Sequence, residues 1–213
     1  KLSGQFGGGD IGTINRNGGT VLLAGTVNND NQTMTWSPTT GGGWTIDQAK
    51  INGGTLSVEP GGEPVFLPKD SSFTERRLEL HGVTLRGSLP VPQSHVNVQE
   101  GLTLDGGVIA ISGDPNYHGM GFFRQGGNPP PVPEVLGVTG TGELRFSPAG
   151  NGGPLPISRS DQTDVRIGAG VTVSGSYEFR GPSYEPLTNH GRLVADISGK
   201  YSSINGAIVN TGT

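Results

Sequence analysis

The sequence predicts an all-β fold, and among all-β folds it favours a parallel β-helix over a β-sandwich. Apolar and polar residues alternate with a period of two in short runs, most clearly between residues 77 and 113. Such alternation is typical of strands with one buried face. Glycine or asparagine closes these runs, and helical apolar periods free of Gly and Pro are nearly absent. Comparable strand positions also recur at intervals of about 23–24 residues, which is typical of stacked coils.

Short strands are expected wherever this alternation occurs, with turns at the glycines between them. The only modest helix candidate is the segment from Asp70 to Arg76. The expected strands lie within residues 21–23, 32–36, 44–46, 50–58, 77–113, 135–136, 143–146, 164–167, 171–173, 177–179, 191–195 and 204–209.

The repeat interval is the main argument for a β-helix. An immunoglobulin-like β-sandwich would show turn signals every 8–12 residues and longer strands. In a β-helix, each coil pairs with the coils before and after it, and inward side chains stack into aliphatic ladders. The anchors used for the interval are Leu56, Leu80 and Leu104, the pair Leu23 and Ile46, and the series Leu144, Ile167 and Leu193.

Composition supports a folded domain with many tight turns. The chain has 213 residues with 39 Gly and 16 Pro, and 31% of its residues are hydrophobic. Disorder is the weaker interpretation, because the apolar residues alternate regularly and only 15% of residues are charged. We expect one domain over 1–213 with loop insertions near 113–134 and 147–161. The strand-and-turn pattern at both ends predicts a piece of a longer chain or assembly.

Charge and motifs argue against several classes of protein. The net charge is −4, and no Lys/Arg cluster is found beyond Arg76 and Arg77, so nucleic acid is not an expected partner. The chain contains no cysteine, no apolar run of about 18 residues, no phosphate-binding GxxxxGK[ST] loop and no GxSxG elbow. We therefore expect no cofactor, no membrane span and no serine-hydrolase triad.

A metal site is not expected either. No two of the four histidines have metal-ligand spacing, and we expect them to face solvent, with His81 pointing outward between Leu80 and Val83. Calcium is a weaker possibility, because the EF-hand loop and the calcium β-roll repeat are both absent. The histidines are His81, His95, His118 and His190, and the carboxylates considered for calcium are Asp10, Asp30, Asp105 and Asp114.

Several phrases of the sequence resemble those of large bacterial surface proteins. They include Ile51-Asn-Gly-Gly-Thr-Leu56, Leu102-Thr-Leu-Asp-Gly-Gly-Val108 and Ile208-Val-Asn-Thr-Gly-Thr213. The chain is similar in these phrases to the repetitive passenger regions of autotransporter-like and filamentous-haemagglutinin-like adhesins. The resemblance implies a right-handed parallel β-helix outside the cell and supplies no catalytic residue.

The first functional hypothesis is therefore structural: an extracellular stalk, adhesin shaft or self-associating filament subunit of a bacterial surface. Unpaired strand edges at the ends of a solenoid favour head-to-tail association or continuation in a longer chain. An alternative structural role is a segment of a phage fibre, which would use the same β-solenoid architecture.

The second hypothesis is a binding module for a glycan or a host surface, based on the insertion 113–134. Loops on a rigid scaffold commonly carry binding residues. The insertion holds aromatic and arginine residues of the kind that anchor interfaces. It could equally fold over the flank of the scaffold as a cap that buries Phe122 and Phe123. The candidate binding residues are Tyr117, His118, Phe122, Phe123 and Arg124.

An enzyme is not the expected function. A carbohydrate-active β-helix would need paired carboxylates on one face, or a basic residue beside a metal-bound uronate. Candidates would be the groups Asp70, Glu75, Arg76 and Arg77, or Asp114, His118 and Arg124.

Overall fold

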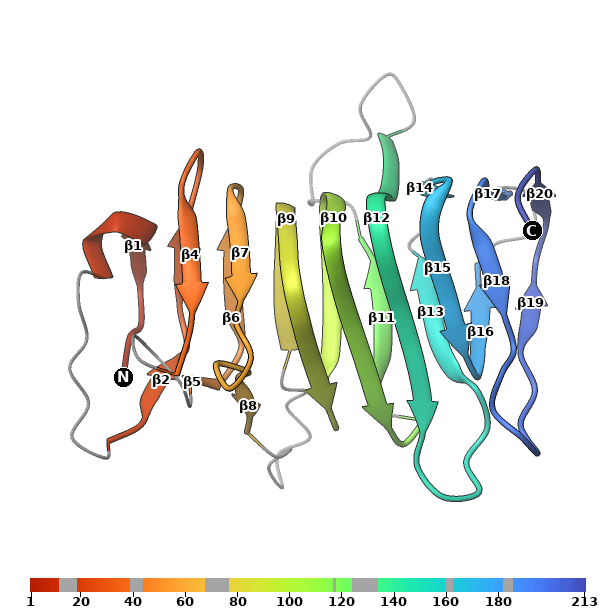
Figure 1. Cartoon of the computed structure of the whole chain (residues 1–213), viewed down its shortest axis with the longest axis horizontal. Coiled ribbons are helices and arrows are strands. Elements are labelled where there is room, and N and C mark those ends of the chain that lie inside the picture. The colour runs from red at the N-terminus through yellow and green to blue at the C-terminus, as the bar shows by residue number, and fades with distance from the viewer. Residues whose placement is uncertain are drawn as a thin grey trace.

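The fold is all-β with a large parallel sheet. The computed structural model describes residues 1–11, 19–38, 44–67, 77–116, 118–123, 134–159, 163–181 and 186–213. The strands stand side by side in chain order (Figure 1), and 17 of them form one sheet. Each strand pairing among the described residues is parallel, which an antiparallel β-sandwich would not show. The segment from Asp70 to Arg76 lies outside the described residues.

The pairings arrange the strands in columns. The first column contains β1 (Gln5–Gly7), β3 (Thr26–Asn28), β6 (Ala49–Asn52), the start of β9 (Arg77–Pro92), the start of β10 (His95–Gly113), β11 (Gly119–Phe122), β13 (Leu155–Arg159), β16 (Tyr177–Arg180) and β19 (Ser203–Asn205). The second column contains β4 (Thr33–Trp36), β7 (Thr55–Val58), the middle of β9 and β10, the start of β12 (Glu134–Pro148), β14 (Thr163–Ile167), β17 (Leu187–Asn189) and β20 (Ile208–Asn210).

A third column is formed by the ends of the three long strands. The ends of β9, β10 and β12 are followed by β15 (Gly170–Gly175) and β18 (Arg192–Val194). A separate three-stranded sheet contains β2 (Val21–Leu23), β5 (Trp44–Ile46) and β8 (Val65–Phe66). The short 3-10 helix η1 (Gly8–Ile11) follows β1.

The core consists of side chains that point inward from the columns and lie beside equivalent side chains of the neighbouring strands. One such ladder in the first column is continuous and buried over most of its length, since apolar side chains stacked in register remove one another from water. It runs through Ala49, Leu78, Val96, Met120, Ile157 and Phe179 to Ile204.

Glycines with positive φ lie where the long strands bend. Gly140 has a φ of 81°, and a Cβ atom there would lie 2.0 Å from the carbonyl oxygen of Leu104 on the neighbouring strand. Gly106 has a φ of 67° with no heavy atom within 4 Å of that position. Gly140 is therefore required both for its backbone conformation and for the close approach of two strands, whereas Gly106 is required for conformation alone.

The spacing between paired strands is less regular than the sequence predicts. Leu23 does pair with Ile46. However, Leu56 pairs with Leu85, which pairs with Leu104, so Leu80 does not belong to that series. The prediction for Leu144 is also wrong, because Leu144 pairs with Val173 and not with Ile167. Paired residues are from about 18 to about 37 positions apart, because the connections between columns differ in length.

The two predicted insertions are not loops throughout. The first contains the buried strand β11, which pairs with β10 on one side and with β13 on the other. The second contains β13. The sequence analysis missed strands β11 and β13 because proline and glycine dominate the residues around them, and because each of these strands is only a few residues long.

Alanine substitutions at two glycines test this packing. We expect Gly106→Ala to lower the free energy of unfolding by about 1 kcal/mol, the cost of positive φ for a residue with a Cβ. Gly140→Ala should cost about 3 kcal/mol or more, because the neighbouring backbone must also move. Urea unfolding of both variants measures the difference. Equal losses would show that the strands do not approach closely at Gly140.

Candidate functional site

The three candidate binding residues of the insertion that the structure describes, His118, Phe122 and Phe123, do not share one exposed surface. Phe122 is fully buried and Phe123 is half-buried. The Phe123 ring lies over Gly121, where a Cβ atom would be 2.0 Å from the ring. Tyr117 and Arg124 lie outside the described residues. The two phenylalanines thus lie on opposite faces of β11, with Phe122 inside and the half-buried Phe123 over the outward face.

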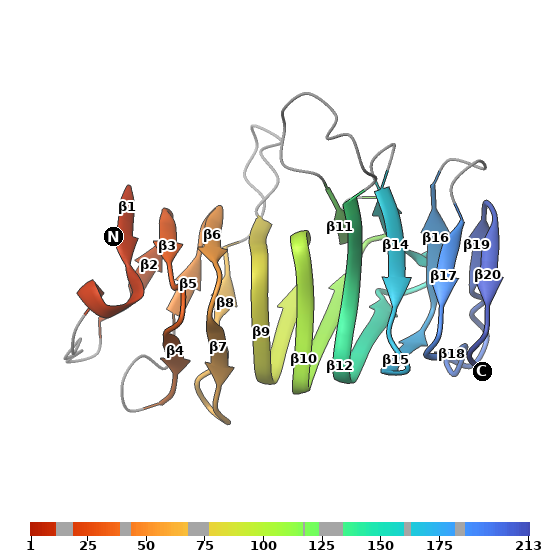
Figure 2. The same cartoon turned by 90° about the horizontal axis from the view of Figure 1, so that it is seen from above.

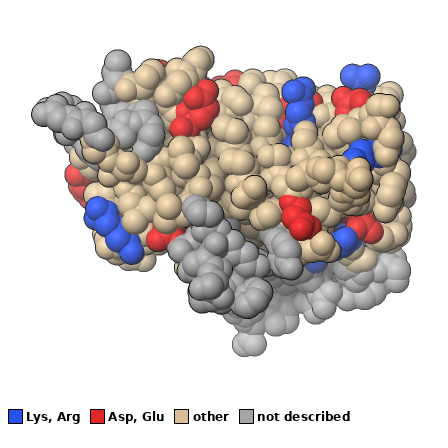
Figure 3. All heavy atoms as spheres, turned by 90° about the horizontal axis from the view of Figure 1, so that it is seen from below, with Lys and Arg blue, Asp and Glu red and all other residues tan. Residues whose placement is uncertain are grey.

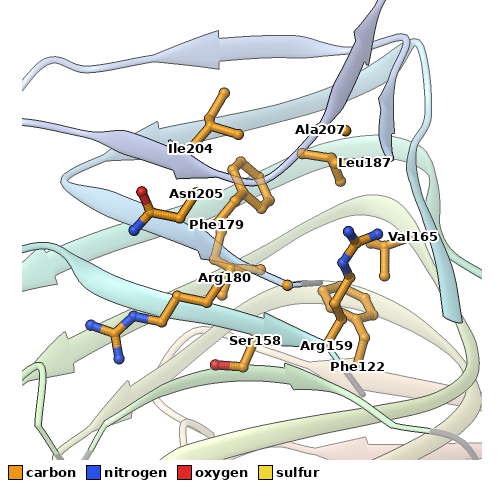
Figure 4. A pocket seen from close by; sticks show the side chains of 12 residues that line it. Phe122, Ser158, Arg159, Val165, Phe179, Arg180, Leu187, Ile204, Asn205 and Ala207 are labelled. Carbon is orange, nitrogen blue, oxygen red and sulfur yellow. The ribbon is translucent and has the colours of Figure 1, made fainter. Parts of the chain in front are cut away.

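Phe122 belongs to the core, which agrees with the alternative that the insertion buries it and not with its assignment to a binding surface. It pairs with Val98 and lines a narrow apolar pocket with Phe179, Leu187 and Val165 (Figure 4). The alternation Gly-Met-Gly-Phe in β11 places Met120 and Phe122 on the same, inward face. That alternation was the signal in the sequence, but glycines in place of polar residues concealed it.

His118 stabilises a turn. The backbone amide of Asp114 donates to Nδ1 of His118 at 2.8 Å, so this nitrogen carries no proton. The Asp114 carboxylate accepts from the backbone and side-chain amides of Asn116, both at 2.9 Å. This turn places Asp114 and Asn116 at the edge of an open groove.

We call this groove the Tyr201 groove. It has a volume of about 540 Å³, within the size range of small-ligand sites. Its residues come from four segments that are far apart in the sequence and are brought together by the stacking of strands. They are Asp114, Pro115 and Asn116; Ala149, Gly152, Gly153 and Pro154; Glu178 and Arg180; and Tyr201.

Glu178 and Arg180 provide the charge of the Tyr201 groove. Nε of Arg180 donates to the Glu178 carboxylate at 2.6 Å, and the same carboxylate accepts from the side-chain amide of Asn205. The Glu178 side chain is 15% exposed, whereas that of Arg180 is 51% exposed. The pair therefore offers a fixed carboxylate next to a guanidinium that can still contact a ligand.

Tyr201 is the exposed aromatic residue of the groove, with 64% of its surface accessible. Its backbone is fixed because Oγ of Ser176 donates to the Tyr201 carbonyl at 2.6 Å. The adjacent Nζ of Lys200 donates to the carbonyls of Gly150 and Gly152, both at 2.7 Å. Apart from Asp114, the sequence analysis missed this groove, because its members join only when strands distant in sequence pair.

A second groove surrounds His81, which is 3% exposed and does not face solvent as predicted. Two adjoining hollows of about 340 and 420 Å³ share Gly82 and Glu100. Nε2 of His81 has no hydrogen-bond partner in the part of the chain that the structure describes, and it lies 3.8 Å from the Glu79 carboxylate. The outward position of His81 is buried because residues of the neighbouring strands cover it.

Burial lowers the pKa of His81 below 6.5. Lys50 lowers it further, while Glu79 and Glu100 partly raise it. The ring is therefore neutral at pH 7, with the charged form disfavoured in the folded state. In the neutral ring, Nε2 of His81 can either donate or accept one hydrogen bond, depending on which nitrogen carries the proton.

The other carboxylates that the sequence analysis considered for calcium each have different neighbours and do not come together. Asp10 accepts from the Gly7 amide at 2.7 Å, and Asp105 pairs with Arg86 at 2.7 Å. Asp30 lies over Gly53, in the His81 groove. Among the described residues, no three His, Asp or Glu side chains converge as a metal site.

Of the candidate catalytic residues, Asp70, Glu75 and Arg76 lie outside the described residues. Arg77 pairs with Glu79 at 3.0 Å. On the face in Figure 3, basic and acidic side chains lie in small neighbouring groups separated by uncharged surface. The described part of the chain has no helix long and apolar enough to cross a membrane.

Comparison of the chain with protein-family models, with curated proteins and with solved structures gives no match.

Acidification tests the environment of His81. Because its pKa is lowered in the folded state, the unfolded state binds the proton more readily, and stability should fall as the pH drops below 6.5. In His81→Gln this part of the loss should disappear. Thermal unfolding between pH 7.5 and 5 measures it. Identical pH profiles for the parent and His81→Gln would contradict the assignment.

Proposed function

We propose that the chain is a structural segment of an extracellular bacterial surface protein, a right-handed parallel β-solenoid that serves as a stalk or adhesin shaft. In this proposal the columns of strands are the faces of a winding chain. The supporting observation is the unbroken parallel pairing of the first column from β1 to β19. A solenoid grows by about 4.8 Å with each winding, so it makes a rigid spacer from local contacts.

The arrangement of the charged side chains is also consistent with a spacer. The long-range pairings hold the strands together, while several outward charged side chains form ion pairs, such as Glu143 with Arg145 at 2.9 Å and Asp164 with Arg166 at 2.9 Å. Exposed pairs of this kind contribute little to stability and mainly keep the surface soluble. The resemblance to adhesin passenger regions supports the extracellular location.

An antibody against the folded chain tests the location. We expect it to label intact cells of the source organism, because a shaft is displayed outside the envelope. An antibody to a cytoplasmic protein of the same cells is the control and should label only permeabilised cells. Labelling of permeabilised cells alone would refute the extracellular role.

A second candidate function is glycan binding in the Tyr201 groove. The observation that favours it is the combination of an exposed tyrosine with the fixed Glu178 carboxylate and the Arg180 guanidinium. An aromatic face packs against the C–H groups of a sugar ring, and charged side chains hydrogen-bond its hydroxyls. The groove is open, as an extended polymer would require.

Substitutions of Tyr201 test this candidate. On a glycan array, we expect Tyr201→Ala to lose binding at least tenfold, while Tyr201→Phe keeps the ring and most of the signal. Val65→Ala changes an exposed residue that does not line the groove and should bind like the parent chain. If the parent chain binds no glycan, or if Tyr201→Ala binds as well as the parent, the groove is not a glycan site.

A further inference from the structure

We infer that the His81 groove binds an amino sugar, with the ammonium group between Asp30 and Glu100 and a ring hydroxyl against His81. The inference is independent of the shaft role and of the Tyr201 groove, which shares no residue with this one. It follows from two carboxylates without a basic partner and from a row of buried polar atoms without hydrogen bonds. The first hollow of the groove is lined by Asp30, Asn52, Gly53, His81, Gly82 and Glu100.

This hollow lies where neighbouring strands turn from the first column into the second. The strands β6, β9 and β10 stand next to one another along the row of strands (Figure 2). Asn52 of β6 pairs with His81 of β9, so Gly53 and Gly82, the residues that follow them, also lie side by side. Two adjacent glycines at the turn leave the hollow open above the backbone.

The two carboxylates lie over this pair of glycines. A Cβ atom at Gly53 would collide with the Asp30 carboxylate, and a Cβ atom at Gly82 would lie 3.8 Å from the Glu100 carboxylate. The two acidic groups thus stand over neighbouring strands, which are about 4.8 Å apart in a β-sheet. An ammonium group that enters between them can donate to both, since it has three N–H donors.

Neither of these carboxylates pairs with a basic side chain among the described residues, in contrast to other outward carboxylates. Lys50, the basic residue whose charge acts on His81, lies beside Glu79 in the first column. The hollow therefore keeps a negative charge of its own, which favours a cationic ligand. The outward carboxylates that do pair with an arginine are Glu79, Asp105, Glu143, Asp164 and Glu178.

A row of polar side chains at the same turn lacks hydrogen bonds. Asn52, His81 and Gln99 are paired neighbours on successive strands, and each has one buried polar atom without a partner in the described part of the chain. The side-chain nitrogen of Asn52 donates to Asn28 at 2.9 Å, which leaves the Asn52 oxygen unpaired. Buried polar atoms without a partner are unfavourable, so a ligand that supplies one gains affinity from it.

A hydroxyl group fits this row. It both donates and accepts, so it can pair with Nε2 of His81 in either neutral tautomer, and it can donate to the Asn52 oxygen. An amino sugar carries hydroxyls at fixed positions next to its ammonium group, whereas a lysine side chain carries the ammonium group alone. The hollow therefore favours an amino sugar over a basic peptide.

The adjoining hollow extends the site along the row of strands. It shares Gly82 and Glu100 with the first hollow and adds Thr103, Thr139 and Arg166 to the lining. The two threonine hydroxyls lie 3.2 Å apart, and the Arg166 side chain is 50% exposed. These groups can hydrogen-bond further sugar hydroxyls, so we expect an oligomer to bind more tightly than a single amino sugar.

Calorimetric titration with short oligomers tests the ligand. The parent chain should bind a glucosamine oligomer at least tenfold more tightly than an N-acetylglucosamine oligomer of the same length, because acetylation removes the charge. A lysine oligomer with the same number of amines should also bind at least tenfold more weakly, since it has no hydroxyls. No binding of the glucosamine oligomer, or binding no tighter than that of either comparison ligand, would overturn the inference.

Substitution of the carboxylates tests the location. Asp30→Asn and Glu100→Gln change exposed side chains, so the fold should persist while each weakens binding of the glucosamine oligomer at least tenfold. Glu59→Gln makes the same change at an exposed residue that lines neither hollow and should bind like the parent chain. Unchanged affinity of Asp30→Asn or Glu100→Gln would refute the site.

Two further results separate this inference from the proposed functions. Tyr201→Ala should keep the affinity of the parent chain for the glucosamine oligomer, because Tyr201 lines the other groove. Loss of binding in Tyr201→Ala would place the oligomer in the Tyr201 groove and overturn this inference. Labelling of intact cells by the antibody tests the shaft role alone, whatever the titrations show.

Discussion

The structure depends on backbone hydrogen bonding between parallel strands that keep one register along the first column. Most of the strands are only two to six residues long and could not persist alone, since their backbone groups need partners on both sides. A neighbour on each side satisfies them and at the same time places apolar residues over apolar residues. One slip by a single residue would turn every inward side chain outward. The alternation in sequence and the pairing in space therefore enforce each other.

Glycine makes the long strands compatible with that register. The strands β9, β10 and β12 run through more than one column, and they bend where a residue adopts positive φ, as Gly82 and Gly101 do. Glu100 has a φ of 57° although it is not glycine, a conformation that costs energy and is held by its neighbours. This residue lies in the His81 groove, so the bend that turns the strand also forms the groove.

The Tyr201 groove has a different origin from the His81 groove. The Tyr201 groove collects residues from three connections between strands and from strand β16, and only the pairing of distant strands brings Glu178 near Tyr201. The segment around His118 was predicted as a binding loop, and the turn that it forms positions Asp114 at the groove. The sequence analysis considered Asp114 only for calcium or for catalysis, and not among the candidate binding residues of the insertion.

The sequence by itself determined the all-β class, the short alternating strands and the near absence of helix, because period-two alternation and turn residues act locally. It also indicated which side chains form the core of β9 and β10. Only the tertiary structure decided which strands pair, that Phe122 enters the core, that His81 is buried, and which residues share a groove. These features depend on the lengths of the connections between columns, and a connection can gain or lose residues without changing the local pattern on either side of it.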